Sequence, residues 1–554
     1  MVKRPQKIQI IPLGGLGEHG KNMTAIRCGD DIVVIDAGLM FPEEDMFGID
    51  LVIPDISYLL DNRDLIRAII ITHGHEEHIG ALPYILPQLG VPVYGGALTV
   101  EIVKNRLQDY RVNHALLNRI GHGDQIILGN FKLGFISVNH SIPDSFAISI
   151  RTPIGTILYT GDFNFDQTPV SGKAAKFHSF AELGDSGVLA LLADSTNAER
   201  AGYTGSERLA GFFLEDAFQA ATGRIITAVF SSNIYSVQQI LDTAQKYKRR
   251  VAIVGKSLET IMTLASRIGH LHIPSNLLIS IDEINCFQAT DLVFIISDNQ
   301  GDPFSALTKL AVGENKKISV MSGDTIVLPA ASIQGNEKNL SRIIDNLLKQ
   351  GAEVISLEKG GIHVSGHASQ EELKLMHNLI RPQFFIPIQG EYRQLVKHGL
   401  IAQDLGMAKE NILIIDNGTV LELTHDKCNI SGRVAAGNIF VDGLGVGDVG
   451  NIVLRDRRQL SQDGIVILIV TLDKEQRTIL AGPDIVSRGF VYIRESEELI
   501  EEARNKVMQI LQRCGEDGIT EWVTLKSAIR DTLGKYLYEK IRRRPMILPI
   551  IMDA

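Results

Sequence analysis

The chain has 554 residues, 45% of them hydrophobic and 22% charged, which is enough apolar material for about three domains and excludes a disordered protein. Its formal net charge of −10 weakly opposes nucleic-acid binding, because nonspecific binding depends on Lys and Arg meeting phosphates. The sequence shows no secretory signal and no apolar run of the roughly 18 residues that cross a membrane. Its cysteines are not paired in motifs. We therefore expect a cytosolic protein without a disulfide framework.

The first 200 residues alternate short β-branched runs with turns. The predicted strands are Ile8–Pro12, Asp31–Asp36, Ala68–Thr72, Ile126–Val138, Phe146–Arg151, Thr156–Thr160 and Val188–Ala193. Clear helical patterns occur at Gly80–Leu89 and Leu98–Arg111. This spacing indicates two mixed sheets and not a regular alternation of strands and helices.

The pattern changes from about Gly205 to a regular alternation. The predicted strands are Ile225–Phe230, Arg250–Val254, Leu292–Ile296 and Thr325–Leu328, and the predicted helices are Ser206–Thr222, Tyr235–Lys246, Leu258–Gly269 and Asn336–Gln350. Such alternation is typical of an α/β unit with a parallel sheet.

The chain is predicted to return to the first domain near Glu353. The elements there are Glu353–Leu357, Gln370–Leu379, Phe384–Ile388, Tyr392–Leu405 and Ile412–Ile415. A glycine-rich stretch then predicts a linker, and the tail predicts a small α/β unit with elements Ile465–Leu472, Val491–Ile493, Ser496–Arg513, Thr524–Arg542 and Met546–Ile551. We therefore predict a first domain in two parts (1–204 and 353–428), an inserted domain (205–352), a linker (429–450) and a C-terminal domain (451–554).

The densest chemical signal follows the buried-strand pattern Ala68–Thr72. The run His73-Gly74-His75-Glu76-Glu77-His78 holds three imidazoles and two carboxylates within six residues. A single histidine is more often a structural residue, but a cluster of this density predicts a metal site for zinc or manganese.

Other polar residues also stand at predicted strand ends, namely Asp36, His140 and Asp162. Each alone could equally be a turn residue or a ligand. Together with the histidine cluster they provide enough ligands for two metals, which can activate a water molecule and clamp a phosphoryl group.

These motifs resemble the metallo-β-lactamase superfamily, within it the β-CASP nucleases, and among these the ribonuclease J family. The resemblance covers essentially the whole chain. Its further matching segments are Pro12–Glu18, Asp36–Glu43, Val52–Asp55, His140–Ser145, Tyr159–Phe163, Asp194–Thr196, His363–Ser369, Gly390–Arg393 and Arg544–Ile547. It implies an αββα metallo-β-lactamase sandwich with an inserted α/β β-CASP domain and a small C-terminal α/β domain.

The resemblance also implies a cytoplasmic, metal-dependent ribonuclease with 5′-to-3′ exonuclease and endonuclease activity, acting in rRNA processing and mRNA decay. The first metal, most simply zinc, would take His73, His75, His140 and the bridging Asp162. The second, zinc, manganese or magnesium, would take Glu77, His78, Asp162 and Gln389. Asp36 would orient metal ligands.

Further roles follow from the same resemblance. A metal-bridging water would attack phosphorus, and Asp194 and His367 would position and help protonate the leaving group. The RNA 5′-monophosphate would bind at Ser232, Asn233, His363, Val364, Ser365, Gly366 and His367, where small residues and backbone N–H groups form a phosphate cradle. The expected partners are 5′-monophosphorylated single-stranded RNA, further copies of the chain in a homodimer or homotetramer that the C-terminal domain helps to assemble, and a paralogous subunit.

Three positions depart from the family pattern. Glu77 stands where the family usually has Asp, Gln389 where it has His, and Ser236 where it has Arg. Because Gln389 offers only a neutral amide oxygen, we expect a firm first metal and a weaker, oxygen-rich second metal that favours manganese or magnesium. The change at Ser236 either weakens binding of the RNA 5′ end or is neutral.

Three functions therefore remain open at this point. The leading one is an active ribonuclease. A weakly active or inactive paralogue that serves as an RNA-binding partner subunit is favoured by Glu77 and Gln389 and opposed by the intact Asp162 and His367. A small-molecule hydrolase, such as a thioesterase or lactonase, is opposed by the domain-sized insertion, because small substrates need no such clamp.

Overall fold

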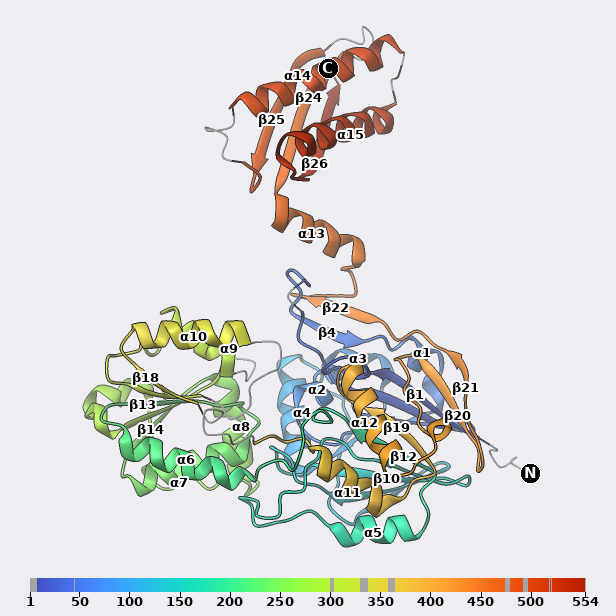
Figure 1. Cartoon of the computed structure of the whole chain (residues 1–554), viewed down its shortest axis with the longest axis vertical. Helices are drawn as coiled ribbons and strands as arrows, with labels where there is room; N and C mark the ends of the chain where they lie inside the picture. Colours follow the sequence, from blue (N-terminus) through green and yellow to red (C-terminus); the bar gives the residue numbers. More distant parts are fainter. Residues whose placement is uncertain are drawn as a thin grey trace. The chain divides into compact units, whose positions relative to one another are not determined.

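The structure is a computed structural model that describes residues 7–43, 45–298, 303–328, 337–356, 364–473, 479–491, 497–517, 519 and 521–553 (Figure 1). The contacts divide the chain into two compact units. One comprises Met1–Met40 and Ile53–Asn438, and the other comprises Phe41–Val52 and Ile439–Ala554.

Two sheets form the centre of the first unit. The eight-stranded sheet has the order β21 (Cys428–Arg433), β20 (Thr419–Leu423), β1 (Ile8–Gly14), β2 (Met23–Cys28), β3 (Asp31–Ile35), β5 (Ile66–Ile70), β6 (Val93–Gly95) and β7 (Leu117–Arg119). The six-stranded sheet has the order β19 (Phe384–Ile388), β12 (Ala190–Asp194), β11 (Thr156–Tyr159), β10 (Phe146–Arg151), β9 (Phe131–Ser137) and β8 (Gln125–Leu128).

The main core lies between these two sheets. Ala68 and Ile70 of β5 pack there with Phe135 and Ile148, because alternate residues of a strand face the same side of a sheet. The opposite face of the six-stranded sheet packs against α5 (Phe177–Asp185), α11 (Gln370–Ile380) and α12 (Tyr392–Asp404). Beside the eight-stranded sheet, α4 (Ala97–Asp109) contacts β6 and β7, and α3 (Leu82–Leu89) packs on α4. The predicted αββα sandwich is confirmed.

The inserted domain is a parallel sheet between helices. Its order is β15 (Leu278–Ile279), β14 (Arg250–Val254), β16 (Leu292–Ile296), β13 (Ile225–Ala228), β17 (Thr325–Val327) and β18 (Glu353–Ile355). In Figure 1, α9 (Pro303–Ala311) and α10 (Glu337–Lys349) lie on one face, and α6 (Glu207–Ala220) and α7 (Ile234–Lys246) lie on the other. Next to them in the chain, α8 (Lys256–Arg267) contacts β14.

Some predicted elements differ from the structure. The strand predicted at Glu353–Leu357 does not belong to the first domain, because β18 pairs with β17 at the edge of the inserted sheet. The run Ile126–Val138 forms two strands, β8 and β9, separated by a turn at Gly129, where φ is +57°. Ile412 makes only an isolated bridge with Phe385 where a strand was predicted.

The predicted linker also contains regular structure. β21 extends the eight-stranded sheet, and β22 (Asn438–Asp442) joins β23 (Gly445–Val446) and β4 (Leu51–Pro54) in a three-stranded sheet. Backbone pairing between distant segments forms these strands, whereas the glycine content alone suggested turns. The strand predicted at Val491–Ile493 lies mostly outside the described residues.

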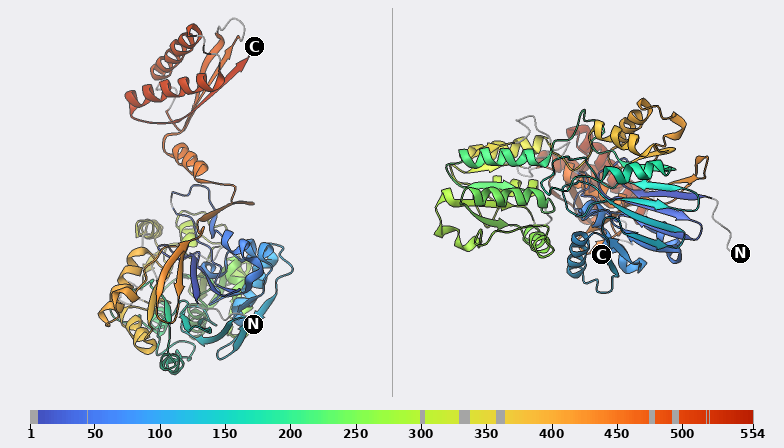
Figure 2. Two further views of the ribbon diagram at one scale, coloured as in Figure 1. Left: turned by 90° about the vertical axis from the view of Figure 1, so that its right-hand side faces the viewer. Right: turned by 90° about the horizontal axis from the view of Figure 1, so that it is seen from below.

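The second unit contains α13 (Asn451–Asp463) and a sheet with the order β25 (Ile479–Arg488), β24 (Ile465–Leu472) and β26 (Met546–Asp553). The helices α14 (Glu497–Glu516) and α15 (Trp522–Ile541) lie on the same face of this sheet, where Val466, Leu468 and Val470 of β24 meet them (Figure 2). Their buried residues recur every three or four positions, as in amphipathic helices. Among the described helices, none is both long enough and apolar enough to span a membrane.

Candidate metal centre and catalytic site

The candidate site lies at the carboxyl ends of strands in the two central sheets. In each sheet the strands concerned are parallel neighbours, β3 with β5 and β11 with β12 and β19, so their carboxyl ends meet at one edge. The polar residues that end or follow these strands and β9 are Asp36, His73, His75, His140, Asp162, Asp194 and Gln389. The buried apolar strands therefore position these polar side chains close together at the carboxyl ends of the strands.

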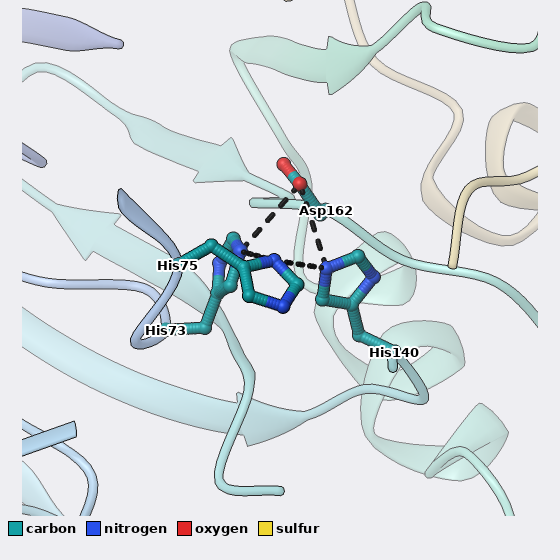
Figure 3. Close-up of side chains that lie close together, drawn as sticks. All are labelled: His73, His75, His140 and Asp162. Atoms are coloured by element: carbon teal, nitrogen blue, oxygen red, sulfur yellow. Dashed lines mark hydrogen bonds and ion pairs between the residues drawn. The ribbon is translucent and has the colours of Figure 1, made fainter. Parts of the chain in front are cut away.

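Four of these residues form one compact group, His73, His75, His140 and Asp162 (Figure 3). One ligand atom from each lies within 4.8 Å of all the others. His75 Nδ1 lies 3.0 Å from both His73 Nε2 and His140 Nε2, and Asp162 Oδ2 lies 3.5 and 3.6 Å from the same two Nε2 atoms. Ligands of one tetrahedral metal at about 2.0–2.1 Å lie about 3.3 Å apart, so these spacings suit a single ion.

Contacts at Nδ1 of His140 and His73 leave Nε2 of each ring free to bind a metal. His140 Nδ1 lies 2.7 Å from the carbonyl oxygen of Gly366, and His73 Nδ1 lies 3.1 Å from the hydroxyl of Thr72. Because Nδ1–H of His140 donates to this carbonyl, Nε2 carries the lone pair that a metal needs.

The pKa values of these side chains also favour the binding of a cation. Burial lowers the pKa of His73 and His75 well below the ordinary value and lowers that of His140 to about 4, despite the nearby Asp162 carboxylate. Burial alone would raise the pKa of Asp162, but the imidazoles of His78, His73 and His367 outweigh it and hold that pKa well below the ordinary value. Neutral imidazoles around a carboxylate are the form in which these groups bind metals.

His78 adjoins the group from α2 (Glu76–Ile79). Its Nδ1 lies 2.8 Å from Asp36 Oδ2, and its Nε2 lies 3.3 Å from Asp162 Oδ1. Burial lowers the pKa of His78, but Asp162 and Asp36 outweigh this and raise it well above the ordinary value. Asp36 is itself fully buried and accepts hydrogen bonds from the backbone N–H and hydroxyl of Thr72, so it orients the His78 ring.

The Gln389 amide, expected at the second metal position, lacks partners within the described part of the chain. Both of its polar side-chain atoms are buried without a hydrogen-bond partner, and the buried Oδ1 atom of Asp162 faces His78 Nε2 at 3.3 Å. Buried polar atoms normally have partners, so these atoms and Nε2 of His78 fit a cation or its water ligands. Glu77 is half-buried on α2 and belongs to neither of the compact ligand groups found among the described residues.

A second compact group combines Asp162, Asp194 and His367. His367 Nδ1 lies 2.8 Å from Asp194 Oδ2 and 3.9 Å from Asp162 Oδ2. Burial lowers the pKa of His367, but the two carboxylates outweigh it and raise the pKa to about 9. The other oxygen of Asp194 accepts hydrogen bonds from the backbone and hydroxyl of Thr196, which fixes the carboxylate. A cationic imidazole thus lies beside the candidate metal ligands.

The loop that carries His367 is held by side chains from the sandwich. Asn164 Nδ2 donates to the Ser365 carbonyl at 2.8 Å, and Asn197 Nδ2 donates to Ser365 Oγ and the His367 carbonyl at 3.0 Å each. Val364 pairs with Gly205 in an isolated parallel bridge. The expected phosphate-binding residues Val364, Ser365 and Gly366 therefore lie on a segment held by these hydrogen bonds, whereas His363 lies outside the described residues.

The other two expected phosphate-binding residues stand at the start of α7. Asn233 caps this helix, since its Oδ1 accepts a hydrogen bond from the Ser236 backbone at 3.0 Å. Ser232 precedes Asn233 in the same turn.

The sequence did not point to two further contacts of the metal site. Asn22 Nδ2 lies 3.1 Å from His78 Nε2, and Arg106 Nη1 lies 2.5 Å from Glu76 Oε1. These partners are 56 and 30 residues apart, and neither has a local spacing signal. The match of Pro12–Glu18 to the family, which ends four residues before Asn22, is the nearest hint in the sequence.

The fold and the site together define a divalent-metal hydrolase of the metallo-β-lactamase type with an inserted domain. Family models match along the chain, with the metallo-beta-lactamase superfamily at residues 16–255, the ribonuclease J beta-CASP domain at 222–347, the Zn-dependent metallo-hydrolase RNA specificity domain at 358–412 and the ribonuclease J C-terminal domain at 452–554.

Similar proteins specify the family. The chain is 46% identical over 553 residues to ribonuclease J2 of Bacillus subtilis, covering 100% of both chains. It is 41% identical over 552 residues to ribonuclease J 2 of Staphylococcus aureus strain NCTC 8325, covering 100% of this chain and 99% of the relative. The chain therefore belongs to the ribonuclease J family of metal-dependent nucleases. A crystal structure of a protein of unknown function from Enterococcus faecalis V583 shares the fold, with a TM-score of 0.54 and 18% identity over 75% of this chain and 100% of that one.

Proposed function

We propose that this chain cleaves RNA phosphodiesters both from the 5′ end and internally. The observation that carries the proposal is the His367–Asp194 pair at 2.8 Å, which lies beside Asp162. It places a proton donor, His367, next to a candidate metal ligand, Asp162. The match to the RNA specificity domain supports RNA as the substrate. The family membership and this intact pair do not favour the alternative of a non-catalytic partner subunit, and the RNA specificity match opposes a small-molecule hydrolase.

In this proposal, His73, His75, His140 and Asp162 hold the first metal, for which their donor set suits zinc. Asp162, His78, Gln389 and Glu77 surround the second position, where zinc, manganese or magnesium would bind. When bound, such metals lower the pKa of water and neutralise the charge of a phosphoryl group.

The protein side chains supply the remaining chemistry. His367 is held through Nδ1 by Asp194, which leaves Nε2 to donate a proton to the leaving ribose oxygen. Asp194 stabilises the cationic ring, and its own fixation by Thr196 keeps the pair aligned. Ser232, Asn233 and the loop 364–366 would hold the RNA 5′ end, with hydroxyl, amide and backbone donors.

The test is cleavage by the purified full-length chain with Mn²⁺. The substrates are a 3′-labelled RNA with a 5′-monophosphate, which reports exonuclease action, and a circular RNA, which reports internal cleavage. Replacing His367 by Ala should lower the rate by about 100-fold or more, the usual contribution of a positioned acid. Arg381→Ala, at the end of α11, is the matched control. A wild-type protein that leaves both RNAs intact with Mn²⁺, with Mg²⁺ and with Zn²⁺ would contradict the proposal.

We further infer a cytoplasmic homo-oligomer that acts in rRNA processing and mRNA decay. The sheet of the second unit has an apolar face turned away from α14 and α15, with half-buried Ile465, Ile467 and Ile469 and exposed Leu548 and Ile550. Such a patch is typical of an interface, and a second copy or a paralogous chain would cover it. All four cysteines are free thiols, as in a reducing compartment.

A further inference from the structure

Asn22, a residue outside the metal motif, lies against the second metal position. Its Nδ2 atom lies 3.1 Å from Nε2 of His78, the nitrogen proposed to bind the second metal. The same nitrogen lies 3.3 Å from Asp162 Oδ1. Neighbouring ligands of one octahedral or tetrahedral ion with bonds of about 2.1 Å lie about 3.0–3.4 Å apart. The Asn22 amide and the Asp162 carboxylate are therefore both at ligand spacing from His78.

Backbone hydrogen bonds hold Asn22 at this place. Its N–H group donates to the carbonyl oxygen of Glu77 at 3.1 Å, and its carbonyl oxygen accepts from the N–H group of Gly38 at 3.0 Å. Glu77 belongs to the metal motif on α2, and Gly38 follows Asp36 by two residues. A Cβ atom at Gly38 would overlap the Glu77 carbonyl oxygen, so these segments pack in direct contact. Asn22 is 6% exposed, and water has little access to its amide.

The Asn22 amide can present its oxygen to an ion bound at His78. A half-turn about the Cβ–Cγ bond exchanges Oδ1 and Nδ2, which have nearly the same size. Oδ1 lies against Gly15, where a Cβ atom would come within 2.3 Å of it, and the glycine leaves room for either group. A cation on Nε2 of His78 repels the N–H groups and attracts the oxygen, which favours the exchanged orientation.

We propose that Asn22 Oδ1 is a ligand of the second metal, beside His78, Asp162 and Gln389. Both polar side-chain atoms of Gln389 are buried without a hydrogen-bond partner in the described part of the chain. Two amide oxygens and a carboxylate oxygen beside one imidazole form a set that favours manganese or magnesium over zinc. Asn22 thus offsets part of the binding that an amide at position 389 gives up. The inference rests on the proposed function, since it takes His78 and Asp162 as ligands of the second metal.

The experiment is a calorimetric titration of the metal-free, full-length chain with Mn²⁺, in which the wild type is compared with Asn22→Ala. We expect the second ion to bind about 10- to 100-fold more weakly in the variant, because losing a ligand costs at least as much as losing an orienting contact. The first ion is the internal control. Its affinity should stay the same, because Asn22 approaches the site through His78, which is not one of its proposed ligands.

Two further variants test whether position 22 touches the ion. Asn22→Asp keeps the shape and offers a charged oxygen, so it should tighten the second Mn²⁺ by about 10-fold, as ligand charge does at other oxygen sites. Asn22→His offers an imidazole and should raise the affinity of the second position for Zn²⁺ relative to Mn²⁺. A purely structural residue would not set this preference.

The matched control is Asn118→Ala. Asn118 is a half-buried amide on β7 of the same sheet, and its Nδ2 donates to the Val93 carbonyl at 3.5 Å. This variant should leave the affinities of both ions unchanged. Thermal melts of all variants with a chelator present show whether each one is folded.

An Asn22 that only donates an N–H group to His78 would compete with the ion for Nε2. Asn22→Ala would then bind the second ion equally well or more tightly, and that result would overturn the inference. An equal loss of affinity for both ions, or the same loss in Asn118→Ala, would also contradict it. A wild type that binds a single Mn²⁺ per chain would overturn it too, whereas the proposed function is decided separately by the cleavage of RNA.

Discussion

At the scale of single residues, the proposed metal ligands depend on neighbours that hold their rings. His140 donates from Nδ1 to the Gly366 carbonyl, and His78 is oriented by Asp36. The same loop that positions His367 thus also fixes His140, a proposed metal ligand. Gly366 is needed there because a Cβ atom would overlap Nδ1 and Cε1 of the His140 ring.

Replacing Gly366 by Ala should therefore weaken the first metal. The added methyl group displaces the His140 ring, and losing such an orienting contact typically lowers metal affinity about 10- to 100-fold. Titration of the metal-free protein with Zn²⁺, followed by calorimetry, measures this. Gly432→Ala is the control, because its Cβ would meet nothing within 4 Å. Equal affinity of wild type and Gly366→Ala would contradict the assigned role of His140.

We propose that Gln389 contributes to the second metal position. Its amide oxygen is a weaker zinc ligand than an imidazole, so the wild type should hold one zinc tightly and a second one weakly. Gln389→His should tighten the second ion about 10- to 100-fold, and Gln389→Met, which keeps the length without a donor, should abolish it. Metal analysis after dialysis gives the stoichiometry. Two equally tight zinc ions in the wild type would refute this account.

At the scale of elements, the start of α11 ties three segments of the site together. The buried carboxylate of Glu372 accepts backbone hydrogen bonds from Phe165 at 2.7 Å and from Thr204 and Ser369 at 2.8 Å each. Phe165 follows the proposed metal ligand Asp162, Thr204 precedes α6, and Ser369 follows His367. One side chain therefore fixes the spacing of the loops that build the site.

Glu372→Ala should destabilise the first unit by about 3 kcal/mol, since it leaves buried N–H groups without acceptors. A thermal melt followed by circular dichroism would report a lower transition temperature. Glu371→Ala removes the neighbouring carboxylate, which pairs at the surface with Lys374, and should change the stability by less than about 0.5 kcal/mol. A similar shift in both variants would argue against the special role of Glu372.

At the scale of the whole molecule, the second unit has its own core and a sheet with one apolar face left open. α14 and α15 cover the side that carries Val466, Leu468 and Val470. The other side of β26 exposes Leu548 and Ile550 by 46% and 38%. Exposed apolar patches often mark interfaces, and we propose that the chain assembles through this face.

Leu548→Asp combined with Ile550→Asp should reduce the molar mass measured by light scattering, because each buried carboxylate would oppose association. Val523→Asp changes an equally apolar, 75% exposed residue on α15 and should leave the mass unchanged. A monomeric wild type, or an unchanged mass in the double variant, would contradict a homo-oligomer formed through this face.

Local patterns were sufficient to locate the metal motif and the strands before it. Ala68–Ile71 is continuously apolar, and a polar cluster soon after such a strand must lie at the end of a sheet. Asp36, His140 and Asp162 were predicted as site residues by the same rule. The alternation of strands and helices after Gly205 similarly identified the parallel inserted sheet.

Long-range packing decided the partners of these residues. His367 meets Asp194 across 173 residues, and Gly366 meets His140 across 226, so no local spacing could pair them. The sequence likewise could not assign β18 to a domain, because its short apolar pattern fits either one. Its pairing with β17 decides the assignment. Side-chain periodicity shows which face of an element is buried. Only the folded backbone determines which residues that face contacts, and the chemistry of the site depends on these contacts.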